Sequence, residues 1–343
     1  MEGDCEGVQI ETKPNPDMKK ITKKESDILT LLKVFSMIGV VLIHTPKPDY
    51  PTFVSTFFDN LTMSCVPIFF LLSGFFLMRK KIETKTIAIL EIRKRINTLL
   101  IPFVFWNTLT LLTSITFFYF VPNLSNGGAG TISDFSFTTI MSAFWGIGRL
   151  PIHYQFWFIR NLMIIVLLAP FLKFLLNRAP WFGLAVAFFL NQWLLDGTIY
   201  FYIGGIMAVY GSSDLFVMKK SGIYIASSLA IMLLALWTEV PHLVILLTSF
   251  ILIISLANLS ELKVGPLSRG DTLPNYVFFV YATHEPLITF TDRLLYKAFG
   301  IPIFVQYFKF VALPIFAVLL TWALGFLMKK YVTKVYNLST GAR

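Results

Sequence analysis

Lys33 and His44 are two ionisable side chains in an almost wholly apolar stretch, residues 28–44. An imidazole titrates near neutral pH, so His44 could act as a general base that takes a proton from a hydroxyl. It could also accept an acyl group covalently. The ammonium of Lys33 could hold an anionic donor. The pair therefore suits the transfer of an acyl group from a charged donor to a hydroxyl.

The spacing of Lys33 and His44 places them on one side of a helix. They are eleven positions apart, and eleven residues complete roughly three turns of an α-helix and rise by about 16 Å. Ionisable groups in membrane-spanning helices usually face a bundle interior or a wet cavity. The alternative is a lysine that extends to the membrane surface and a histidine that only ends the helix.

A second group of cations consists of Arg93, Lys94 and Arg95, within a basic stretch at 79–98. Guanidinium and ammonium groups bind phosphates as charged clamps. The group therefore suits a donor that carries phosphates on the cytoplasmic side and has a long arm reaching His44. The alternative is that it reflects only the usual excess of Lys and Arg on cytoplasmic loops.

Ser73 and Arg160 are polar candidates in other apolar segments. Ser73 precedes Gly74 and could be a nucleophile, but a small pair of residues also lets helices approach closely. Arg160 should face the interior of the protein, either at a functional site or in a structural ion pair.

His284 and Glu285 stand beside Pro286 in a late apolar segment, so at least one of them is expected to line a cavity. His284 could hydrogen-bond a backbone carbonyl that the proline leaves open. His153 and His242 lie near predicted helix ends and are expected at the surface.

The composition excludes an ordinary soluble domain. Apolar residues make up 56% of the chain and charged residues 14%, and the mean hydropathy is +0.70. The net charge of +10 is typical of a protein beside anionic lipid, so no nucleic acid partner is expected. The two cysteines have no metal-ligand spacing, and no metal is expected.

The apolar segments predict an all-α, polytopic membrane bundle of about ten transmembrane helices. Residues 1–27 are expected to form a disordered cytoplasmic tail, residues 28–330 the transmembrane domain, and residues 331–343 a cytoplasmic C-terminal tail. The predicted spans are 28–45, 61–78, 99–121, 156–176, 181–195, 198–211, 222–238, 242–259, 272–291 and 303–328. Residues 133–148 could form a helix along the membrane surface.

The distribution of Lys and Arg supports ten spans with both termini in the cytoplasm. In that orientation the inner regions hold 22 of the 29 Lys and Arg residues and the outer loops hold four. Lys33 then lies toward the cytoplasm and His44 toward the opposite face. The expected location is a bacterial cytoplasmic (inner) membrane.

The order of these features resembles the acyltransferase-3 family, whose members are integral membrane acyltransferases that modify sugars and surface polysaccharides. The resemblance covers residues 28–330, and its motifs are short but occur in the same order at matching spacing. The matching residues are Lys33 and His44; Pro67, Phe69, Phe70, Ser73, Gly74 and Phe75; Arg93 to Arg95 followed by Leu99, Leu100 and Pro102; Trp157 and Phe158; and Tyr281, His284 and Pro286.

Two positions depart from the family pattern. Lys33 replaces the usual arginine, which keeps the charge but loses the planar fork. Thr98 stands where many members have another basic residue, so the anion grip would rely on Arg93 and Lys94.

The resemblance implies an O-acyltransferase that takes an acetyl group from cytoplasmic acetyl-CoA, or another short acyl group such as succinyl. The acceptor would be a hydroxyl of an extracytoplasmic sugar or polysaccharide, as in exopolysaccharide biosynthesis, and oligomers are compatible with it. His44 would be catalytic, as a base or as a transient acyl carrier. The donor would be held by Lys33, Arg93, Lys94 and Arg95, and the cavity lined by Ser73, Trp157, Arg160, His284 and Glu285.

Two other readings compete with the acyltransferase. A flippase or exporter of lipid-linked sugars would explain intramembrane Lys33, Arg160 and His44 as a polar pathway without chemistry. A polysaccharide polymerase is expected to carry a larger outer loop than residues 121–153.

Overall fold

The protein is described by a computed structural model, which is helical throughout its regular structure. The described residues are 20–48, 52–80, 85–120, 132, 134–211, 216–264, 273–300 and 302–342. Their helices are α1 (Lys23–Ile43), α2 (Thr52–Thr62), α3 (Cys65–Met78), α4 (Lys85–Phe120), α5 (Phe137–Trp145), η2 (Tyr154–Phe156), α6 (Trp157–Arg178), α7 (Pro180–Trp193), α8 (Thr198–Tyr210), α9 (Ser221–Leu234), α10 (His242–Val264), η4 (Leu273–Tyr276), α11 (Val277–Phe299), α12 (Ile303–Tyr331) and α13 (Thr333–Thr340).

Six helical segments of the described chain are long and apolar enough to cross a membrane, which confirms the predicted polytopic bundle. The apolar helices α8 and α9 are shorter, with 13 and 14 residues. They rise by only about 20 Å, against a hydrocarbon core of about 30 Å. The long segments are Lys23–Ile43, Phe53–Met78, Ile89–Phe120, Tyr154–Arg178, His242–Glu261 and Ile303–Tyr331.

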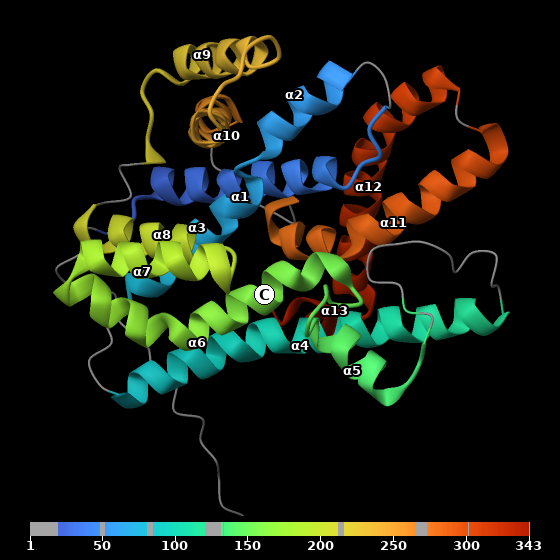
Figure 1. Cartoon of the computed structure of the whole chain (residues 1–343), viewed down its shortest axis with the longest axis horizontal. Helices are drawn as coiled ribbons and strands as arrows, with labels where there is room; N and C mark the ends of the chain where they lie inside the picture. The colour runs from blue at the N-terminus through green and yellow to red at the C-terminus, as the bar shows by residue number, and fades with distance from the viewer. Residues whose placement is uncertain are drawn as a thin grey trace, which may run out of the picture.

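Helix α1 forms the centre of the bundle. It packs against α2, α3, α10, α11 and α12, and Figure 1 shows it between α10 on one side and α3 on the other. Its apolar side chains Ile28, Met37 and Val41 are fully buried. The central position means that cavities beside α1 are enclosed by other helices rather than by lipid.

Helices α3 and α8 approach each other closely at Gly74. A Cβ atom on Gly74 would lie 1.9 Å from the carbonyl oxygen of Phe201, and one on Gly204 would lie 2.0 Å from that of Leu71. Only glycine fits such a backbone contact. The neighbouring residue Ser73 points about 100° away from Gly74 around α3, and it borders the cavity described below.

Several element boundaries differ from the predicted ones. Helix α1 begins at Lys23 instead of residue 28, because Thr22 and Glu25 form a capping box. The remainder of the predicted N-terminal tail, residues 1–19, lies outside the described residues. The second span is interrupted between Thr62 and Cys65, where the backbone N–H of Ser64 donates to Ser249 Oγ at 3.1 Å.

Residues 85–98 of the basic stretch before the third span are part of a helix. Helix α4 runs unbroken for 36 residues through Pro102, which corresponds to about 54 Å. It is longer than the hydrocarbon core, so its basic N-terminal part extends beyond the apolar region. The segment predicted as a C-terminal tail contains α13, which packs on α4 and accepts a hydrogen bond from Trp106 Nε1 at Ser339 O, at 2.9 Å. Its buried Tyr336 packs against Tyr276 and Phe279.

Candidate active site

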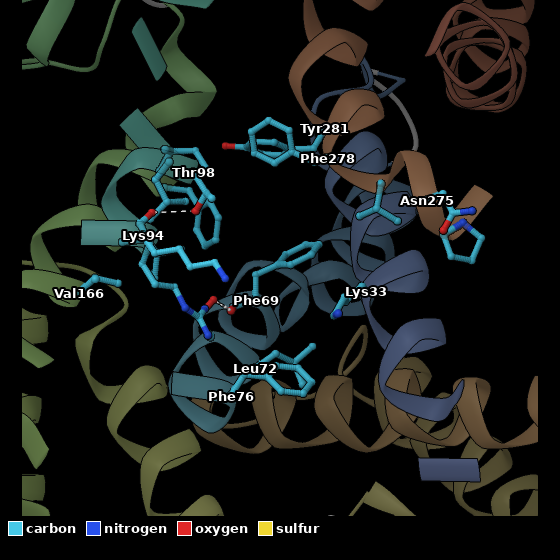
Figure 2. Close-up of a pocket in the computed structure, with 18 of the residues that line it drawn as sticks. Lys33, Phe69, Leu72, Phe76, Lys94, Thr98, Val166, Asn275, Phe278 and Tyr281 are labelled. Carbon is cyan, nitrogen blue, oxygen red and sulfur yellow. Dashed lines mark hydrogen bonds between the residues drawn. The ribbon is translucent and has the colours of Figure 1, made fainter. Parts of the chain in front are cut away.

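A cavity of about 700 Å³ lies beside Lys33 in the middle of α1, and we call it the inner cavity. Its walls come from α1, α3, α4, α6, η4, α11 and α12. Figure 2 shows Lys33 and Lys94 on opposite sides of the hollow. The residues that line it are Lys33, Phe69, Leu72, Ser73, Phe76, Lys80, Glu91, Lys94, Arg95, Thr98, Leu99, Phe158, Ile159, Leu162, Val166, Pro274, Asn275, Val277, Phe278, Tyr281 and Lys329.

The charged side chains of the inner cavity are predominantly cationic. Glu91 is the single carboxylate among the lining residues, and Lys80 forms an ion pair with it. The ammonium of Lys33 lies 5.1 Å from the centre of the Phe76 ring. Five cations against one anion favour a ligand with several negative charges. The cations are Lys33, Lys80, Lys94, Arg95 and Lys329.

The three side chains of the predicted basic cluster point in different directions from α4. Lys94 and Arg95 line the inner cavity, whereas Arg93 is exposed and is not among the lining residues. Successive residues of a helix point about 100° apart, so all three side chains cannot face one cavity. Thr98 lines the cavity next to Arg95, to whose carbonyl oxygen its hydroxyl donates at 2.8 Å.

Ser73 lines the inner cavity, but its hydroxyl donates to the carbonyl oxygen of Phe69 at 2.8 Å. That carbonyl belongs to the preceding turn of the same helix. In the described residues no basic side chain is hydrogen-bonded to the Ser73 hydroxyl in a way that would activate a nucleophile. The geometry therefore favours a packing and lining role.

His44 lies at the C-terminal end of α1, where it is the cap residue. Tyr154 Oη is 2.7 Å from His44 Nδ1, and the ring centre of His284 is 5.2 Å from that of His44. The carboxyl group of Glu285 acts electrostatically on the Tyr154 hydroxyl. We call these four residues the His44 cluster.

Pro286 shapes the side of α11 that faces the cluster. Because proline has no N–H, the carbonyl of Ala282 lacks its usual helical donor. His153 Nε2 lies 3.0 Å from that oxygen, and Gln155 Nε2 donates to it at 2.9 Å. These contacts anchor η2 on α11 and place Tyr154 against His44.

Two predictions about histidines are wrong in this region. His153 was expected at the surface, but only 3% of it is exposed, because it lies under Trp106 and against α11. His284 was expected to take the carbonyl opened by Pro286, but its Nδ1 lies 3.1 Å from the oxygen of Val280. Its Nε2 is buried without a hydrogen-bond partner in the described part of the chain.

An aromatic partition separates the inner cavity from the His44 cluster. Phe158, Phe278 and Tyr281 line the cavity, whereas His44 does not. The Tyr281 ring centre lies 6.0 Å from that of Phe158 and 6.2 Å from that of His284. Figure 2 shows Phe278 and Tyr281 together at one end of the hollow. A group that passes from the cavity to His44 must cross this layer.

Trp157 and Arg160 are not among the residues that line the inner cavity. The Arg160 guanidinium donates to the carbonyl of Gly146 and, at 3.3 Å, to that of Arg149. It thereby fixes the loop after α5. The Trp157 ring packs near Phe70, with ring centres 6.3 Å apart. Both side chains thus stabilise the helices and loops around the site.

Sequence reasoning did not single out Tyr154, Lys80 or Lys329. Tyr154 precedes the Trp157–Phe158 pair by three residues, which is the only signal near it in the sequence. Lys80 and Lys329 lie at the ends of apolar segments, where lysines are common. In the described residues no three His, Cys, Asp or Glu side chains are grouped so as to hold a metal ion.

Comparison with known proteins identifies the chain. The family model described as "Acyltransferase domain" matches residues 27–330. The succinoglycan biosynthesis protein ExoH of Rhizobium meliloti (strain 1021) is 25% identical over 173 residues, which cover 44% of this chain and 43% of ExoH. The chain thus matches less than half the length of this curated relative.

No solved structure matches the chain. The family match reaches into all six long apolar segments that could cross a membrane and covers every residue of the inner cavity and the His44 cluster. The chain belongs to the acyltransferase-3 family and is an integral membrane protein.

Proposed function

We propose that the protein transfers an acetyl or other short acyl group from cytoplasmic acyl-CoA to a hydroxyl of an extracytoplasmic sugar or polysaccharide. The observation that carries the proposal is the construction of α1. The middle of this helix contributes Lys33 to a basic cavity, and its C-terminal end holds His44 in a hydrogen-bonded cluster. The donor's charges and the chemistry are thereby assigned to two positions about three turns apart on one helix.

The inner cavity suits the phosphates of CoA. Lys94 and Arg95 offer an ammonium and a planar guanidinium on α4, opposite Lys33 on α1. Charge-assisted hydrogen bonds from such groups are the usual way to hold phosphate. Lys80 and Lys329 belong to segments that the Lys and Arg distribution assigns to the cytoplasm, so the donor enters from that side.

The separation of the two positions suits the length of the donor. Eleven residues of helix between Lys33 and His44 correspond to about 16 Å. An extended pantetheine arm has a comparable reach, so a donor held by its phosphates can present its thioester near His44. The thioester must pass the aromatic partition, and we expect that layer to open when the donor is bound.

The reaction can proceed by direct transfer. His44 takes the proton of the acceptor hydroxyl, the hydroxyl oxygen bonds to the acyl carbon, and the carbon–sulfur bond breaks. The proton then passes to the departing thiolate, which leaves as CoA. In the second route His44 bonds to the acyl carbon, the carbon–sulfur bond breaks, and CoA leaves as the thiol with the proton from the imidazole. The acceptor hydroxyl then bonds to the acyl carbon, the bond between the acyl group and His44 breaks, and the hydroxyl proton returns to the imidazole.

The acceptor class is supported by the relative, whose name places ExoH in the biosynthesis of succinoglycan, a polysaccharide. Surface glycans from matched cells with and without the gene should differ by the mass of one acyl group per modified sugar. The mass difference would also separate acetyl from succinyl transfer. Identical glycan masses would contradict the proposal.

A CoA-binding measurement distinguishes an acyltransferase from an exporter of lipid-linked sugars. The melting temperature of the purified protein should rise with CoA concentration and then saturate, because a ligand that binds the folded state stabilises it. Arg95→Ala should weaken this effect. Arg178→Ala is the matched control, because Arg178 is exposed at the end of α6 and outside the cavity. Wild-type protein that CoA does not stabilise would overturn the proposal.

A further inference from the structure

His284 has one ring nitrogen that is hydrogen-bonded and one that is not. Nδ1 lies 3.1 Å from the carbonyl oxygen of Val280, and a carbonyl oxygen can only accept a hydrogen bond. Nδ1 therefore carries the ring proton, and Nε2 of the neutral ring is a lone-pair acceptor. Among the residues that the structure describes, Nε2 has no hydrogen-bond partner, and the residue is 0% exposed. A protonated ring would bury a charge with an unpaired donor, which is costly.

The unpaired nitrogen lies just beyond the aromatic partition. Phe278 and Tyr281 lie at one end of the inner cavity (Figure 2), and His284 follows Tyr281 by three residues on α11, or about 4.5 Å of rise. The ring centre of His284 is 6.2 Å from that of Tyr281 and 5.2 Å from that of His44. His284 is thus the residue that links the partition to His44.

A ligand reaches His284 from the side of the donor. His44, Tyr154 and Glu285 are each partly exposed, whereas His284 is completely covered. A group that crosses the partition from the inner cavity comes directly to the His284 ring. A buried acceptor without a partner destabilises the folded protein, so the vacant Nε2 suits a hydrogen-bond donor that this group brings with it.

The pantetheine arm of CoA carries such donors, because it contains two amide N–H groups. The amide nearest the sulfur is separated from it by two methylene groups, so its nitrogen lies about 5 Å from the acyl carbon of an extended thioester. The rings of His44 and His284 are separated by a similar distance, 5.2 Å. An amide that crosses an aromatic layer loses its hydrogen bonds to water and needs an acceptor beyond that layer.

We propose that Nε2 of His284 accepts a hydrogen bond from the pantetheine N–H nearest the sulfur and thereby sets the depth at which the thioester stops beside His44. The inference rests on the proposed function and identifies the contact that positions the donor's reactive end. His284 is a donor-binding residue in this account, and it takes no proton during the reaction.

The test combines a change in the ligand with a change in the protein. The ligands are CoA and its ester analogue, in which an oxygen replaces the N–H nearest the sulfur. Affinity is measured by calorimetric titration of the purified full-length protein, so neither the reaction nor an acceptor glycan is needed. Wild type should bind CoA about fivefold more tightly than the ester analogue, which is the effect of one hydrogen bond.

Two variants of His284 complete the cycle. His284→Phe keeps a ring but removes the acceptor, so it should bind CoA about fivefold less tightly than wild type and should not distinguish CoA from the ester analogue. His284→Gln places an amide oxygen near the position of Nε2 and should restore part of the preference. His242→Phe is the protein control, because His242 is exposed. The ligand control replaces the other N–H of the arm, and it should weaken binding to wild type and His284→Phe by the same factor.

The outcomes separate binding from other roles of His284. A structural role predicts that His284→Phe weakens both ligands equally, and a role as a base predicts unchanged affinities with a lower kcat. Either result would overturn the proposal, as would equal affinities of wild type for CoA and the ester analogue. Wild-type protein that does not bind CoA would overturn the proposed function as well. If His284→Phe lacks a cooperative thermal transition, His284→Ala replaces it in the cycle, because alanine is smaller and also lacks an acceptor.

Discussion

The middle of α1, around Lys33, and its C-terminal end, at His44, have opposite surroundings, and we call them the inner and outer ends of the site. The inner end borders a cavity whose charged walls carry five cations and one carboxylate. The outer end is packed with rings and hydrogen bonds, and His44 there has a fixed partner on Nδ1. Charged ligands need a wet, charged site, whereas a general base needs a fixed orientation. The difference assigns binding to the inner end and chemistry to the outer end.

The largest expected effect is at the outer end. His44→Ala should lower acyl transfer by about 10²- to 10⁴-fold, the usual contribution of a general base, or more if His44 carries the acyl group. The CoA-dependent rise in melting temperature should persist. Transfer is measured by label from acetyl-CoA, with His242→Ala as the control because His242 is exposed. Retained transfer in His44→Ala would refute the assignment.

Substitution of a cation at the inner end should raise the KM for the donor. Arg95→Ala should raise the KM for acetyl-CoA by about tenfold, the effect of losing a hydrogen bond to a charged group, with a smaller change in kcat. Arg93→Ala is a matched control two residues away, because its side chain is exposed and outside the cavity. Equal effects of the two variants would show that the inner cavity is not the donor site.

The partition between the two ends can be removed by one substitution. Phe278→Ala should connect the inner cavity with the His44 cluster and let water reach the thioester near the base. We expect a severalfold rise in acetyl-CoA hydrolysis without acceptor, measured as free thiol. Hydrolysis at the wild-type rate would show that Phe278 does not separate the two regions.

The smallest expected effect concerns Lys33, which replaces the arginine that is usual in the family. Lys33→Arg should restore a planar fork for phosphate and lower the KM for the donor by about threefold. The guanidinium must fit beside the Phe76 ring, where the Lys33 ammonium lies now. A raised KM would mean that Lys33 is fitted to its site by shape rather than by charge alone.

The helical period made part of this site predictable. It placed Lys33 and His44 along one helix, and the order of motifs indicated the family. The same period separates Arg93 from Arg95 on α4, but the predicted third span begins only at residue 99 and leaves both residues outside it. The helical state follows from the packing of α4 on α6 and α13, which no local pattern specifies.

The partners of His44 could not be predicted from the sequence. Tyr154 lies 110 residues from His44 and Glu285 a further 131 from Tyr154, so only tertiary packing brings them together. The link depends on Pro286, whose missing N–H leaves a carbonyl for His153 and Gln155. A proline signals an open carbonyl, but it does not say which side chain will bind there.

The central claim is that the acyl group enters at the Lys33 end and is transferred at the His44 end. It is tested most directly in sealed vesicles of known orientation, with radiolabelled acetyl-CoA supplied to one face and acceptor glycan to the other. We predict labelled glycan only when the donor is on the face that carries the 79–98 segment and His44 is intact. Equal labelling with the donor on either face, or labelling by His44→Ala, would contradict the account.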